Sequence, residues 1–182
     1  MIAIALSPDN GRLAITGISA SGANLMGGFV AVLDATNGDS LWVADPFEQI
    51  ADQLAFSPGG SLLLMAGTDH PPRLIVAALG RPGSGLRQHC AVPPPDSFQS
   101  TRHHAAFPGR GDSIAAACSE GTTEVCKAAR GECRVIIELH FIGIDGLAAY
   151  PDGRHVAVPA NGNTVTLRDL QAEEPRQVYR YR

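Results

Sequence analysis

The chain has 182 residues, 45% hydrophobic and 18% charged, a composition typical of a globular protein large enough to bury a core. Its formal net charge of -4 argues against a nucleic-acid partner, because phosphate binding needs concentrated lysine and arginine. The longest apolar runs are only strand-length, so no membrane-spanning helix is predicted. The first residues do not resemble a signal peptide, and the four cysteines match no zinc or haem spacing. Together these features predict a cytoplasmic protein.

Four similar phrases follow one another along the chain: IALSPDNGRLAITG, LAFSPGGSLLLMAG, AAFPGRGDSIAAAC and LAAYPDGRHVAVPA. Aligned on Gly11, Gly60, Gly111 and Gly153, they lie 49, 51 and 42 residues apart. Such a period indicates stacked supersecondary units, and four-stranded propeller blades have repeats of about 40 to 50 residues. The sequence therefore predicts one domain of four repeats, at about 1–45, 46–95, 96–140 and 141–182.

Each repeat contains four short apolar runs separated by Gly, Pro, Asp or Asn, which is the pattern of strands joined by hairpins. In chain order, strands are predicted at 2–6, 13–17, 29–34, 40–43, 54–56, 62–66, 73–79, 86–92, 105–107, 113–118, 123–128, 133–139, 147–150, 155–159, 164–169 and 177–181. The continuous runs SLLLMAG and DSIAAAC indicate inner strands buried on both faces. Long loops are predicted at 19–28, 44–53 and 92–104. We therefore expect an all-β chain.

The phrase LAFSPGGSLLLMAG and the segment AAYPDGRHVAVPANGNTVTLRDL resemble blades of WD-repeat and YVTN-like bacterial β-propellers. This resemblance covers nearly the whole chain and implies four four-stranded antiparallel blades. The Trp-Asp pair that ends the third strand of a WD repeat is absent. Leu33-Asp34 and Arg168-Asp169 stand in its place in the first and fourth repeats.

Four blades are fewer than the six to eight that usually close such a ring, and closure is what removes sheet edges. An incomplete or half propeller is therefore predicted, and three arrangements follow from it. The chain is part of a longer propeller, two copies pair as a homodimer, or four blades close alone. In the first two arrangements a terminal blade would otherwise expose an apolar face, which soluble monomers rarely tolerate.

Two groups of side chains could carry chemistry. His103 and His104 are adjacent, and His70 lies in the corresponding loop of the second repeat; a metal site would need three such ligands to converge. Solvated loop histidines are the preferred interpretation, so no metal or other cofactor is predicted. Cys126 and Cys133 flank a hairpin, where a cross-strand disulfide is conceivable. Buried free thiols acting as small apolar residues are preferred there.

The loops that enter the first strand of a repeat carry aromatic, histidine and arginine side chains, which protein interfaces favour. The candidate binding residues are Phe47, His70, Phe98, Arg102 and His103. Catalytic motifs are lacking, so we predict a non-catalytic scaffold that binds a protein or peptide, without nucleic acid or membrane. The alternative is a fragment of a lactonase-like propeller hydrolase with a metal in its central channel. No catalytic residue is predicted.

Overall fold

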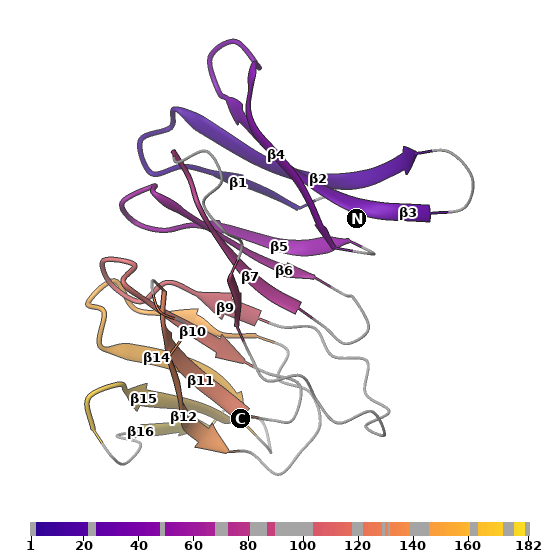
Figure 1. The fold of residues 1–182 in the computed structure, drawn as a ribbon. Coiled ribbons are helices and arrows are strands. Elements are labelled where there is room, and N and C mark those ends of the chain that lie inside the picture. The colour runs from indigo at the N-terminus through magenta and orange to yellow at the C-terminus, as the bar shows by residue number, and fades with distance from the viewer. Residues whose placement is uncertain are drawn as a thin grey trace. The chain divides into compact units, whose positions relative to one another are not determined.

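The computed structural model describes residues 3–21, 25–47, 50–67, 73–80, 87–89, 104–117, 122–128, 130, 132–138, 146–160, 164–172 and 177–180. All regular elements within these ranges are β-strands, as predicted (Figure 1). The described part of the chain contains no helix that is long and apolar enough to cross a membrane.

The strands form four antiparallel sheets, each a meander of four strands in chain order. Sheet A contains β1 (Ile4–Leu6), β2 (Arg12–Ser21), β3 (Leu25–Asp34) and β4 (Ser40–Phe47). Sheet B contains β5 (Ala51–Phe56), β6 (Leu62–Gly67), β7 (Arg73–Ala78) and β8 (Arg87–His89). Sheet C contains β9 (His104–Ala106), β10 (Ser113–Ala117), β11 (Thr122–Lys127) and β12 (Cys133–Glu138). Sheet D contains β13 (Ala148–Ala149), β14 (His155–Ala160), β15 (Thr164–Asp169) and β16 (Gln177–Arg180).

The chain divides into two compact units. Unit 1 comprises Met1–Gln88 and holds sheets A and B, and unit 2 comprises His89–Arg182 and holds sheets C and D. His89, at the end of β8, falls just beyond the boundary. Each unit is described by itself below.

Two segments predicted as long loops are wrong in part, because they are largely strand. In the 19–28 segment, β2 continues to Ser21 and β3 begins at Leu25, and the two strands pair in register. The small residues of this hairpin disguise it as a loop. Earlier in the same hairpin, Gly17 lies opposite Phe29. A Cβ at position 17 would collide with the Phe29 ring, so packing requires a glycine there. In the 44–53 segment, β4 extends to Phe47 and β5 begins at Ala51.

The repeated phrase forms the turn between the first and second strands of a sheet. In sheet A, the Ser7 hydroxyl accepts a hydrogen bond from the backbone N–H of Arg12 at 2.8 Å. In sheet B, Ser57 accepts one in the same way from Leu62 at 3.0 Å. The serine therefore satisfies a backbone donor that would otherwise lie unpaired at the hairpin end.

One residue of this turn has a left-handed backbone conformation, and its place shows that the alignment of the first repeat on Gly11 is off by one residue. This position is filled by Gly60 in sheet B and by Gly153 in sheet D, with φ of 67° and 72°. In sheet A it is filled by Asn10, with φ of 58°, and not by the adjacent Gly11. Asparagine tolerates the left-handed region better than most side chains, so it substitutes for glycine here.

The core of unit 1 lies between sheets A and B. Ala14, Val30 and Val32 of sheet A pack with Leu63 and Met65 of sheet B in one buried cluster. A polar link crosses the same interface, where the buried Thr16 hydroxyl donates to the carbonyl of Ala51 at 2.8 Å. Unit 1 is therefore two sheets packed face to face.

Unit 2 repeats this arrangement with sheets C and D. Ala115 and Ala117 of β10 pack with Val156 and Val158 of β14. The turns of the two sheets also touch, since a Cβ on Gly109 would lie 2.5 Å from Cα of Gly153. Small residues therefore lie where the two sheets approach each other most closely in this turn contact.

The burial of the second strands confirms the prediction of two-sided burial. In β6 every residue from Leu63 to Gly67 is buried, and in β10 every residue from Ile114 to Ala117 is buried. A strand covered on both faces loses the alternation of polar and apolar residues, as these sequences do.

Candidate functional site

Most of the predicted binding residues lie outside the described part of the chain. These are His70, Phe98, Arg102 and His103, together with most of the predicted 92–104 loop. Phe47 is described as the last residue of β4, where its backbone pairs with Gly28. It therefore lies in a strand and not in the predicted 44–53 loop. The predicted binding loops therefore stay a prediction.

His104 lies in a strand of sheet C and not in the loop that precedes it. It is the first residue of β9, it pairs with Ala117 and its side chain is half-buried. Adjacent residues of a strand point to opposite faces, so a strand position for His104 does not favour a shared ligand role with its neighbour.

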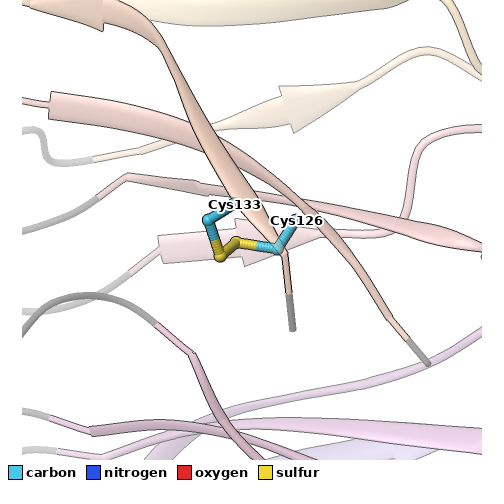
Figure 2. The surroundings of a disulfide bond; sticks show 2 residues. All are labelled: Cys126 and Cys133. Carbon is cyan, nitrogen blue, oxygen red and sulfur yellow. A yellow bond between two sulfur atoms is a disulfide. The ribbon is translucent and has the colours of Figure 1, made fainter. Parts of the chain in front are cut away.

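Cys126 and Cys133 form a disulfide, so the preference for free thiols is wrong (Figure 2). The two residues face each other across the β11–β12 hairpin, with their Cα atoms 4.0 Å apart. The next pair along the hairpin explains this closeness, because the N–H of Lys127 donates to the carbonyl of Glu132. Cys126 and Cys133 are therefore a non-hydrogen-bonded pair, which is the type with the shorter Cα–Cα distance in an antiparallel ladder. Register alone brings the sulfur atoms together.

Glu124 lies two residues before Cys126, on the same face of β11, and its pKa is raised because burial penalises the charged form. One carboxylate oxygen of Glu124 and the two sulfur atoms lie within 4.8 Å of one another. Such a set could hold a soft metal only as thiolates, and the disulfide removes both thiolates. In its oxidised form this cluster is a covalent brace of the hairpin.

Asp169, one of the residues standing in for the absent Trp-Asp pair, is fully buried at the end of β15. Its carboxylate accepts hydrogen bonds from Nε of Arg154 at 2.9 and 3.0 Å and from Nη2 at 2.7 Å. The N–H of Gln171 donates to it at 2.9 Å. The Arg154 hydrogen bonds, more than any other contact, hold the pKa of Asp169 well below its usual range. Asp169 is thus a buried carboxylate whose ionised form is stabilised by Arg154 in the β13–β14 turn.

A cavity of about 420 Å³ opens in unit 2, between the β11–β12 hairpin and the turns of sheet D. Its lining combines two cations, Lys127 and Arg134, with one carboxylate, Glu132, and the Gln171 side chain. Nη2 of Arg134 donates to the carbonyl of Leu170 and so ties the hairpin to sheet D. Val125, Cys133 and Leu170 also line the cavity, so it combines charged and apolar groups.

Sequence reasoning missed this cavity because its lining combines residues of sheet C with turn residues of sheet D that lie further along the chain. The spacing of Lys127, Glu132 and Arg134 within one hairpin was the available signal. No protein-family model matches the chain, and no curated protein shows significant similarity to it.

Proposed function

We propose that this chain is a non-catalytic scaffold of β-propeller blades of the WD-repeat type, which binds a protein or peptide partner. The observation that carries this proposal is the succession of four meander sheets in chain order, each of four antiparallel strands. Two such sheets pack face to face within each unit, which leaves strand ends and connecting loops available for recognition. The predicted contacts are Phe47, His70, Phe98, Arg102 and His103.

The electrostatics of the described residues favour binding over acid–base catalysis. A general acid needs a raised pKa in a site that a substrate can reach. Four aspartates instead have a lowered pKa, in each case first through a hydrogen bond to a neighbouring side chain or backbone group: Asp9, Asp34, Asp152 and Asp169. Glu124, whose pKa is raised, lies beside the disulfide. The four aspartates stabilise turns through these hydrogen bonds.

The test is a selection of peptides from a displayed library against the purified chain, followed by affinity measurements by calorimetry. The variants F98A and R102A should weaken binding of the selected peptide by at least about fivefold, since truncation of an aromatic or arginine hot spot costs about 1 kcal/mol or more. K127A, at the described cavity, is the matched control at a different surface. Loss of affinity in K127A alone would move the binding site to the cavity in unit 2.

A separate measurement addresses the hydrolase alternative. A scaffold should retain no stoichiometric calcium or zinc after dialysis and should not hydrolyse lactones or simple esters. A stoichiometric ion together with turnover would contradict the proposal, whereas an ion without turnover would point to a structural role.

A further inference from the structure

One face of sheet A is apolar and open to solvent. The register of the sheet places Ile4, Ile15, Ala31 and Val43 in one cross-strand row. The row beside it contains Leu6, Leu13 and Leu33. Three of these side chains are strongly exposed: Ile4 at 66%, Leu6 at 53% and Val43 at 58%. We call these two rows the open face of sheet A. Contiguous apolar surface of this kind marks an interaction site in a soluble protein.

The repeat itself indicates what covers such a face. The turns align Leu13 and Ile15 of β2 with Leu63 and Met65 of β6, because each pair begins six residues after the turn serine. Leu63 and Met65 are fully buried in the cluster between sheets A and B. In sheet B, the face equivalent to the open face of sheet A is therefore covered. The cover is the opposite face of sheet A, which carries Ala14, Val30 and Val32.

The same equivalence holds in unit 2. Val156 and Val158 of β14 occupy the positions of Leu13 and Ile15, and they are fully buried in the cluster between sheets C and D. Here too the covering surface is the opposite face of the preceding sheet, which carries Ala115. One packing mode thus joins both pairs of sheets.

Sheet D presents the kind of face that provides this cover, and it is open. Its register aligns Pro159, Val165 and Tyr179 in one row on the side away from Val156 and Val158. Tyr179 is 49% exposed and Pro159 is exposed. Tyr150, which is 46% exposed, lies beside this sheet at the β13–β14 turn. We call the Pro159–Val165–Tyr179 row the open face of sheet D.

We propose that the open face of sheet A binds the open face of sheet D of a second copy of this chain. The contact continues the face-to-face packing that joins sheets A and B and sheets C and D, so the partner is another four-stranded sheet of the same repeat. An aliphatic face, with Val43 at its edge strand, meets a face that carries a tyrosine. The inference rests on the blade packing invoked in the proposed function.

The experiment measures the mass of the full chain by light scattering during gel filtration, for the wild type and for V43K and Y179K. The wild type should associate into particles of at least 38 kDa, which is twice 19.0 kDa. Each lysine should reduce this to 19.0 kDa, because a charge buried in an apolar contact is strongly unfavourable. S61K, at an exposed turn position of sheet B, should associate like the wild type.

A mixture of the two variants provides the decisive measurement. V43K keeps the open face of sheet D and Y179K keeps the open face of sheet A, so an equimolar mixture should form one heterodimer of 38 kDa (2 × 19.0 kDa). Circular dichroism of each variant checks that the β-structure is retained.

Three results would overturn the inference: a wild-type chain that stays at 19.0 kDa, association that survives either lysine, or variants that do not combine when mixed. A monomeric wild type would mean that another protein or another segment covers these faces. Peptide binding by monomeric V43K would still support the proposed function, so the two proposals fail separately.

Discussion

Asp169 shows how one buried carboxylate can fix a turn. It joins the end of β15 to Arg154 in the β13–β14 turn, and it also accepts a hydrogen bond from the backbone N–H of Gln171. A buried charge is tolerated only when it is paired and hydrogen-bonded, and both conditions are met here. The Arg154–Asp169 pair thus links the end of β15 to the turn that precedes β14.

The low pKa of Asp169 predicts a pH-dependent contribution to stability. Because the pKa is lower in the folded than in the unfolded chain, the ionised carboxylate stabilises the fold above the unfolded value of about 4. This stabilisation is lost as the pH falls towards the folded value. The difference in unfolding free energy between wild type and D169N should therefore shrink below about pH 4. Urea unfolding over a pH series measures it, with D112N at an exposed carboxylate as the control.

A difference between wild type and D169N that does not change with pH would contradict this account. It would mean that the amide loses the same interactions at every pH, and that charge is not what Asp169 contributes. Asp152 adds a smaller influence of the same sign, because its pKa is also lowered, first by the backbone N–H of Arg154. D169N and D112N both keep Asp152, so its pH-dependent contribution is the same in the two variants.

At the scale of elements, the repeated turn does two things at once. Its left-handed residue closes the hairpin, and in unit 2 its backbone lies against the turn of the neighbouring sheet. Gly109 in the β9–β10 turn and Gly38 in the β3–β4 turn, which is not a repeated turn, allow the two roles to be compared. Both have positive φ, at 59° and 79°, but a Cβ on Gly38 would meet nothing within 4 Å.

The variant G38A should therefore lose only the conformational preference of glycine, about 1 kcal/mol of unfolding free energy. G109A should lose clearly more, because its Cβ would lie 2.5 Å from Cα of Gly153 and one backbone must move. Chemical unfolding followed by circular dichroism compares the two. Equal losses would show that the turn-to-turn contact has no energetic weight.

The strands were predictable because local signals specify them. Turn residues and apolar runs placed all sixteen strands within a few residues, and the absence of alternation identified β6 and β10 as buried. The far end of the β2–β3 hairpin was hidden because it is built from small residues, whose composition resembles that of a loop. The cavity in unit 2 was equally hidden, since it depends on how the ends of sheets C and D meet.

The disulfide marks the limit of reasoning from spacing. Two cysteines seven residues apart can be bridged only if they are direct partners in the ladder, and a shift of one residue would place them on opposite faces. Sequence located the hairpin but not its register. The disulfide does not favour the predicted cytoplasmic location, because disulfides persist mainly in oxidising compartments.

At the scale of the whole molecule, the two units each have a core of their own, and the disulfide lies within unit 2. Replacement of both cysteines by alanine, C126A/C133A, should therefore act locally. Closing a loop of seven residues is worth about 2 kcal/mol through the reduced entropy of the unfolded chain. That loss should appear as faster amide exchange in β11 and β12 of unit 2.

Amides of β6 and β7 in unit 1 should exchange as they do in the wild type, because their burial depends on a different cluster. Hydrogen exchange followed by mass spectrometry reads both regions in one sample, so unit 1 serves as the internal control. Faster exchange in unit 1 as well would show that the two units open as one cooperative structure. In that case a brace in a single hairpin would control the stability of all four sheets.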